Sequence, residues 1–143
     1  MTETILLSLD GSDAEGHDTG RTDAAIDRAL ELAGPGGVVH AHYVVDTGRY
    51  GEPALSSTEI LIDDVEDAGN ELLAAVDERG RERGVTVLTR CCHGRPHEEL
   101  AAYAAEVGPD AIVLAGRPRP GRVRKDLERV TDRVVAPRAV VGR

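Results

Sequence analysis

A turn rich in arginine is the part of the sequence whose residue types most readily suggest chemistry. It reads AGRPRPGRVRK from residue 115 to residue 125, between the apolar run DAIVL and a stretch with helical periodicity. Anions often bind where a strand leads into a helix, because the first N–H groups of the helix point toward the ligand. Guanidinium groups bind phosphate through paired hydrogen bonds, and the turn offers those of Arg117, Arg119, Arg122 and Arg124. The alternative is a solvated basic loop that pairs with an acidic neighbouring subunit or covers the site.

Histidines and cysteines on two apolar runs form a second group with chemical potential. His40 and His42 lie two residues apart, as do Cys91 and His93. Residues two apart on a strand share a face, so these four side chains could form a tetrahedral metal site if the two strands are neighbours. Strand histidines and buried cysteines without a metal are far commoner, and we expect no metal site. The adjacent Cys91 and Cys92 point to opposite faces of a strand, which excludes a disulfide between them.

Motifs that would support an enzyme are missing from the sequence. There is no Gly-x-Ser-x-Gly elbow and no Walker Gly-Lys-Ser/Thr. The DGSD stretch at residues 10–13 lacks the ligand series and the terminal glutamate of a calcium loop. With no nucleophile and no carboxylate pair marked out by its setting, we expect a protein that is not an enzyme.

Apolar runs alternate with amphipathic stretches along the chain, and this alternation predicts the fold. We expect strands at residues 4–10, 38–46, 85–94, 110–116 and 138–142. The helices between them begin at Thr22 or Asp23, at Ser56 and at Pro96, and the last is striped by Leu127, Val130 and Val134. The pattern is typical of one α/β domain over residues 1–143, a doubly wound parallel sheet with helices on both faces. Ligands bind such sheets at the carboxyl ends of the strands where the winding reverses, which favours Asp10 and residues 114–116.

The charge balance limits the partners that the chain can take. The formal net charge is −9, from 17 basic and 26 acidic residues, and a net acidic surface argues against nucleic acid. Residues 1–114 hold 8 basic and 23 acidic residues, whereas residues 115–143 hold 9 and 3. The acidic, lysine-poor composition indicates a halophile, with high-GC coding as the alternative. No apolar run approaches the ~18 residues of a membrane span, and no signal peptide is visible, so we expect a cytoplasmic protein.

Five motifs in order carry a resemblance: ILLSLDGS, HYVVD, HGRPHEEL, DAIVLAG and VTDRVV. Together they resemble the universal stress protein (UspA-like) family over nearly the whole chain. The resemblance implies a Rossmann-like, five-stranded parallel sheet of order 3-2-1-4-5. It also implies a homodimer, often built by pairing the last strands, which here would be residues 138–143.

ATP-binding members of that family carry a glycine, two residues, a second glycine, nine residues, and a third glycine followed by Ser or Thr. Aligned without gaps between DAIVL and VTDRV, this chain has four other residues there: Ala115, Pro118, Glu128 and Arg129. Proline removes an N–H donor, glutamate adds negative charge beside a polyphosphate, and arginine replaces the hydroxyl. The motif keeps its spacing and loses its chemistry.

Part of the nucleotide site of that family has matching residues in this chain. If the motif is aligned one residue further along the chain, Gly116 takes the place of the first glycine. Arg119 and Arg129 then take the places of the second and third glycines. The resemblance implies that Asp10 contacts the ribose or adenine and that Val44 contacts the adenine. Residues 11–22 form a loop several residues longer than is usual in the family, either a lid or a tolerated insertion.

These observations favour a stress-response or regulatory protein that acts as a dimer with an unidentified protein partner, without standard ATP binding and without a cofactor. The alternative is an adenine-nucleotide switch. In it Asp10, Val44 and Gly116 hold the nucleoside of ATP or a similar nucleotide and the arginines hold phosphate. A third, weaker reading is an enzyme that hydrolyses ATP slowly.

Overall fold

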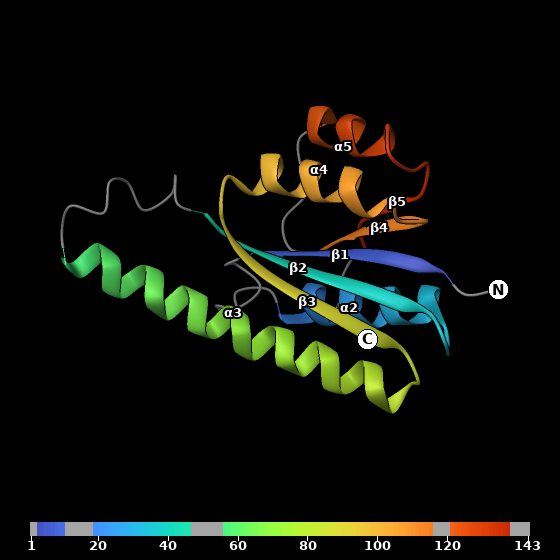
Figure 1. Ribbon diagram of the computed structural model, residues 1–143, viewed down its shortest axis with the longest axis horizontal. Coiled ribbons are helices and arrows are strands. Elements are labelled where there is room, and N and C mark those ends of the chain that lie inside the picture. Colours follow the sequence, from blue (N-terminus) through green and yellow to red (C-terminus); the bar gives the residue numbers. More distant parts are fainter. Residues whose placement is uncertain (1–2, 11–18, 47–55, 116–120, 138–143) are drawn as a thin grey trace.

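The computed structural model describes residues 3–10, 19–46, 56–115 and 121–137 (Figure 1). Its centre is a parallel sheet of five strands in the order β3-β2-β1-β4-β5, as the sequence predicts. The strands are β1 (Thr4–Asp10), β2 (Val38–Asp46), β3 (Thr86–Gly94), β4 (Ala111–Leu114) and β5 (Val134–Val135). The helices are α2 (Thr19–Ala33), α3 (Ser56–Glu82), α4 (Pro96–Val107) and α5 (Gly121–Glu128).

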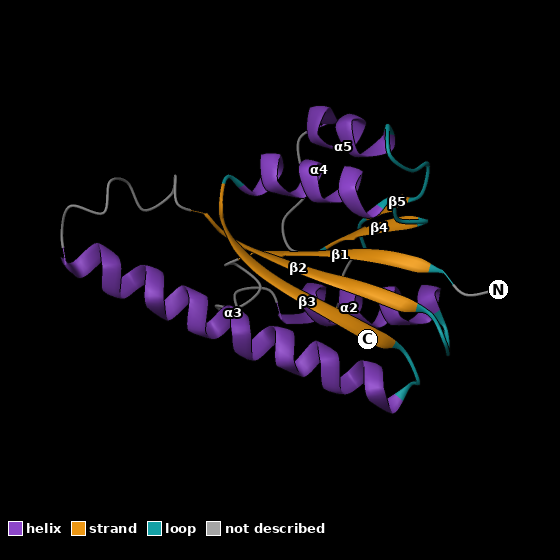
Figure 2. Cartoon of the chain, in the orientation of Figure 1, coloured by secondary structure: helices purple, strands orange, loops and turns teal. Residues whose placement is uncertain are grey.

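The helices form a layer on each face of the sheet. Helices α2 and α3 cover one face, and α4 and α5 cover the other (Figure 2). Right-handed crossovers require this arrangement, because the chain winds outward from β1 to β3 and then crosses back to β4. Among the helices of the described ranges, none combines the length and apolarity that crossing a bilayer requires.

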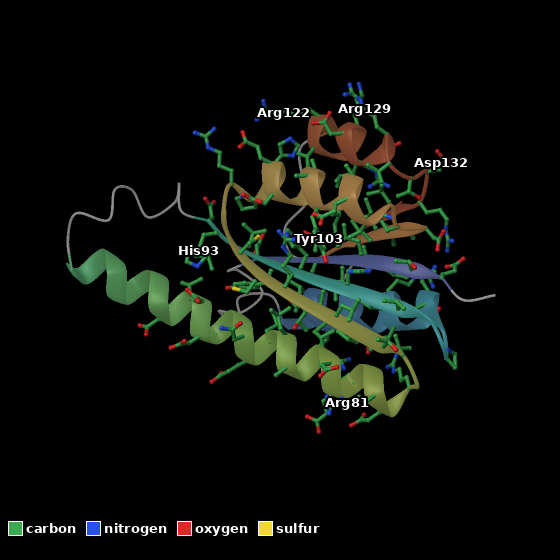
Figure 3. All side chains as sticks on the ribbon, in the orientation of Figure 1. Arg81, His93, Tyr103, Arg122, Arg129 and Asp132 are labelled. Atoms are coloured by element: carbon green, nitrogen blue, oxygen red, sulfur yellow. The ribbon has the colours of Figure 1, made fainter. Side chains whose placement is uncertain are left out.

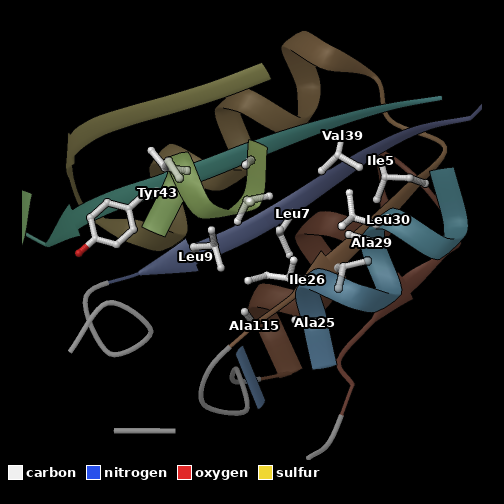
Figure 4. Close-up of a cluster of buried hydrophobic side chains, with 14 of the residues drawn as sticks. Ile5, Leu7, Leu9, Ala25, Ile26, Ala29, Leu30, Val39, Tyr43 and Ala115 are labelled. Atoms are coloured by element: carbon white, nitrogen blue, oxygen red, sulfur yellow. The ribbon is translucent and has the colours of Figure 1, made fainter. Parts of the chain in front are cut away.

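The larger core lies between the sheet and the α2–α3 layer (Figure 4). Alternate residues of β1, Ile5, Leu7 and Leu9, point into it and meet Ile26 and Leu30 of α2. These side chains are at most 1% exposed. Successive strand residues point to opposite faces, so the intervening residues of β1 are free to build a second core.

The second core lies between the sheet and the α4–α5 layer. Leu6 of β1 and Ile112 of β4 pack there against Leu100 of α4 and Leu127 of α5. Strand β1 is therefore buried on both faces, which explains why its sequence is a continuous apolar run.

The carboxyl-terminal part of the fold corrects the sequence prediction. Helix α5 ends at Glu128, and Val134 lies in β5, paired in register with Ile112, instead of continuing the helical stripe. The N–H groups of Val130 and Thr131 both bond to the carbonyl of Leu127, which closes the helix. The predicted strand at residues 138–142 lies outside the described residues.

Candidate functional site

Three of the predicted site residues lie near the carboxyl edge of the sheet, and one of them, Ala115, packs in the larger core. Asp10 ends β1 and stands opposite Val44 of β2 in the register. Ala115 follows β4, and its N–H donates to the carbonyl of Ser8 at 3.0 Å. Val44 and Ala115 are buried and Asp10 is half-buried. These residues lie on three neighbouring strands at the point where the winding reverses, the usual place for a ligand in such sheets.

Other predicted residues of this site fall outside the described ranges. They are Gly116, Arg117 and Arg119 of the arginine-rich turn, together with residues 11–18 of the long loop. Their assignment to phosphate or to a lid stays a prediction.

Arg129 directly follows the carboxyl end of α5 and lies away from Asp10. The helix runs back across the face of the sheet, so residues that follow it reach the amino edge. There, Thr131 donates its hydroxyl to the carbonyl of Asp110 at 2.7 Å, and Asp110 donates its N–H to Thr4, the first residue of β1. The side chain of Arg129 is 82% exposed and points away from the sheet (Figure 3).

In the alignment without gaps, the described residues that follow β4 differ from the glycine motif at three of its places, Ala115, Glu128 and Arg129. Glu128, at the place of the third glycine, ends α5 instead of beginning a helix. No serine or threonine occurs between Ala115 and Val130, so this stretch of sequence offers no hydroxyl in place of the one that ends the motif. The first hydroxyl after β4 belongs to Thr131, which is bound at the opposite edge.

The proposed set of two histidines, Cys91 and His93 does not come together. The register pairs Tyr43 with Cys91 and Val45 with His93, so these two side chains face α3. His93 contacts Glu66 of α3 at 3.0 Å, while His40 and His42 face α4. Within the described part of the chain, no group of three or more His, Cys, Asp or Glu residues could hold a metal ion.

Cys92, which the sequence reasoning passed over, lies beside the buried histidine instead. Its Sγ atom is 3.3 Å from Nε2 of His42. The ring of His42 stacks on Tyr103 of α4, with centroids 4.7 Å apart. The Tyr103 hydroxyl lies 3.1 Å from Nδ1 of His40. The Arg90 guanidinium lies over the Tyr103 ring, with its central carbon 4.6 Å from the ring centroid.

Burial keeps this cluster neutral. It lowers the pKa of His42 to about 4, with a further contribution from the positive charge of Arg90. Burial also lowers the pKa of His40 and raises the pKa of the Cys91 and Cys92 thiols. Both cysteines are free, and a protonated thiol is a poor nucleophile. The cluster therefore joins β2, β3 and α4 through neutral histidines and thiols, by hydrogen bonds and ring stacking, beside the charged Arg90.

Comparison with known proteins agrees with the fold. A family profile described as Universal stress protein family matches residues 1–137. A universal stress protein of Methanocaldococcus jannaschii is 31% identical over 136 residues, which cover 94% of this chain and 76% of that protein. A solved universal stress protein family structure from Burkholderia pseudomallei has 27% identity and a TM-score of 0.66, with 95% and 97% of the two chains covered. An AMP-bound family protein of Arabidopsis thaliana has 16% identity and a TM-score of 0.61, with 92% and 88% covered.

Proposed function

Because the chain belongs to the universal stress protein family, we propose that it is a stress-response regulator that works as a homodimer, through a protein partner and without standard ATP binding or catalysis. The observation that carries this proposal is the chemistry after β4. The first hydroxyl beyond Ala115 is that of Thr131, and it is held at the amino edge by Asp110. A phosphate at the carboxyl edge has no hydroxyl partner in this segment.

The backbone of the same segment adds support. Pro118 supplies no N–H donor where the motif places its second glycine. If this segment were rearranged to form the phosphate site of the motif, Glu128 would place a negative charge beside the polyphosphate. Both departures oppose phosphate binding.

The test is calorimetric titration of ATP, ADP and AMP into nucleotide-stripped protein, at moderate and at high salt. We expect no heat of binding and no thermal shift with any of the three. Tight binding with a preference for ATP would contradict the proposal. Measuring at two salt concentrations matters because salt screens contacts between arginine and phosphate.

The homodimer is tested separately through residues 138–143. An unpaired apolar edge strand is a liability that pairing with a second copy removes. Val140→Pro removes an N–H donor from that strand and should give monomers or aggregates in sedimentation. Val140→Thr keeps the N–H and the branched side chain, so it should leave the dimer intact. A dimer that survives the proline would overturn pairing through this strand.

A nucleotide switch is the second candidate, and one observation favours it. Asp10 and Val44 are register partners near the carboxyl edge, and Ala115 follows the neighbouring strand β4. The relative from Arabidopsis thaliana holds AMP on a similar fold. In this case Arg117→Glu with Arg119→Glu should weaken nucleotide binding at least tenfold. Arg129→Glu is the matched control, because Arg129 lies at the far end of α5 and should not matter. Equal affinity in the wild type and the double variant would exclude the switch.

A further inference from the structure

Two helices on opposite faces of the sheet carry opposite charges on their solvent sides. Helix α3 holds nine acidic and two basic residues in its sequence. Helix α5 and the residue after it hold four basic and two acidic residues, Arg122, Arg124, Lys125 and Arg129 against Asp126 and Glu128. Because the sheet separates them, the two surfaces cannot meet within one molecule (Figure 2).

The acidic residues of α3 form a continuous line, here called the acidic ridge. Spacings of three, four, seven and four keep its members on one side of the helix. That side is opposite Val65, Leu73 and Val76, which are buried in the larger core. The ridge is about 27 Å long at the usual helical rise. The members of the acidic ridge are Asp64, Asp67, Glu71, Glu78 and Glu82. All of them are exposed, and within the described residues none of them takes part in a salt bridge.

The two arginines of α3 do not neutralise the ridge. Arg79 turns toward α2, where it pairs with Asp23 and Asp27. Arg81 pairs with Asp77 of its own helix at 3.1 Å. The negative charge of the ridge is therefore left to solvent or to a partner.

The outer side of α5 is the complementary surface, here called the basic ridge. Arg122, Lys125 and Arg129 follow one another at spacings of three and four, opposite the buried Val123 and Leu127. Figure 3 shows Arg122 and Arg129 on the outside of the helix.

The acidic residues of α5 are engaged with other side chains. Asp126 lies 3.3 Å from His97 of α4, and Glu128 lies 3.6 Å from Arg124. Within the described ranges, the basic ridge forms one ion pair, between Arg129 and Asp126 at 3.9 Å. The basic ridge therefore keeps its charge.

We propose that the basic ridge of one copy docks on the acidic ridge of a second copy, so that the protein assembles head to tail. Helix α5 is about 12 Å long and fits within the acidic ridge. Two different surfaces meet in such a contact, so each added copy leaves one ridge of each kind free at the ends, and short chains grow. This contact is additional to the proposed two-fold dimer and does not depend on it.

Exposed ion pairs are individually weak and are screened by salt, so the assembly should be weak and salt-sensitive. Sedimentation velocity of the full chain at about 0.1 M and about 1 M salt tests this, since the Debye length falls from about 10 to about 3 Å. We expect larger, concentration-dependent species at the lower salt only. Identical sedimentation at both salts would overturn the proposal.

Charge exchange identifies the two surfaces. Arg122→Glu with Lys125→Glu, and separately Glu71→Lys with Glu78→Lys, should each abolish the larger species. Mixing the two variants should restore them as mixed complexes, because each reversed ridge then has an oppositely charged partner. Failure to restore them would overturn docking between copies. Circular dichroism on each variant establishes that it is folded.

The control for the acidic-ridge variant is Glu98→Lys with Glu106→Lys, which raises the net charge by the same amount at exposed positions of α4. It should leave the larger species unchanged, and their loss would show that overall charge and not the ridges controls assembly. A duplex DNA fragment offered at about 0.1 M salt should not bind the basic ridge. Binding that Arg122→Glu with Lys125→Glu removes would make nucleic acid the occupant and overturn the proposal. Val140→Pro should leave the salt-dependent species in place, which separates this contact from the two-fold dimer.

Discussion

The Sγ atom of Cys92 lies 3.3 Å from Nε2 of His42, across the pairing of β3 with β2. The imidazole is 1% exposed, and its other nitrogen, Nδ1, has no hydrogen-bond partner among the described residues. Tyr103 covers one side of the ring. A charge on this imidazole would be both desolvated and close to Arg90, so the folded protein strongly favours the neutral form.

We predict that the fold loses stability in mild acid through His42. Its pKa falls from 6.5 in the unfolded chain to about 4 in the fold, so below pH 6.5 the unfolded chain binds the proton more tightly. The contribution to stability is complete above the unfolded pKa and is lost as the pH falls toward the folded pKa. Urea unfolding should show about 2 kcal/mol lower stability near pH 5 than near pH 7.5 from this group.

His42→Phe keeps an aromatic ring on Tyr103 and removes the titration. It should flatten the dependence of the free energy of unfolding on pH in this range. His93→Gln is the matched control, since His93 is exposed and pairs with Glu66 of α3. A variant at residue 42 with the same pH dependence as the wild type would refute the assignment.

We predict that both thiols react slowly at neutral pH. Burial raises the pKa of Cys91 and Cys92, and Glu66 and Glu99 add to the respective shifts. The thiolate is the reactive form, so alkylation by iodoacetamide should be several-fold slower than for a small thiol at the same pH. Cys91→Ser and Cys92→Ser variants assign the rates to each residue. Equal rates for the folded and the urea-unfolded protein would contradict the prediction.

The sheet could be predicted from the sequence because burial on both faces leaves a local trace. The run from Ile5 to Leu9 is apolar except for the buried Ser8, and each of its apolar residues enters one of the two cores. The order of strands then follows from the alternation with helices and from crossover handedness. The same topological argument indicated Asp10 and residues 114–116, whereas Val44 came from the family resemblance, and their role in binding stays a prediction.

Two features could not be read from local pattern. Whether Cys91 or Cys92 shares a face with His42 depends on the register of β3 against β2, and a shift by one residue exchanges them. The end of α5 depends on Thr131, which bonds to Asp110 at a distance of 21 residues in sequence. Helical spacing of Leu127, Val130 and Val134 carries no sign of that tertiary contact.

We predict that Gly69→Ala in α3 lowers the free energy of unfolding, although alanine is usually the better helix former by about 1 kcal/mol. A Cβ atom at residue 69 would overlap the ring of Tyr43, which is fully buried. The ring cannot withdraw without breaking the bond from its hydroxyl to the carbonyl of Val65, at 3.0 Å. Overpacking should outweigh propensity, for a net loss of about 1 to 2 kcal/mol in urea unfolding.

Asn70→Ala is the control for that substitution. Residue 70 is exposed on the same helix, so only propensity changes there, and stability should stay equal or rise slightly. A stabilising Gly69→Ala would show that Tyr43 has room to move, contrary to the packing described.

The last prediction concerns the ion pairs that join α2 to α3. Asp27 accepts hydrogen bonds from Arg79 and from Arg83, the latter at 3.0 Å, and Arg79 also reaches Asp23 at 3.3 Å. Because Asp27 accepts from two arginines, its loss should cost more than the loss of an isolated surface pair. A double-mutant cycle of Asp27→Ala and Arg79→Ala should give a coupling of about 0.5 to 1 kcal/mol.

The pair of Asp77 with Arg81 provides the comparison, since it lies within α3 and Arg81 is 78% exposed. Its cycle should give no more than about 0.5 kcal/mol, and both couplings should shrink near 1 M salt. Only the first pair connects two helices, so only its loss removes a tertiary contact. If the two cycles gave the same coupling, the network at Asp27 would contribute no more than an ordinary helical surface pair, and the packing of α2 on α3 would rest on apolar contacts alone.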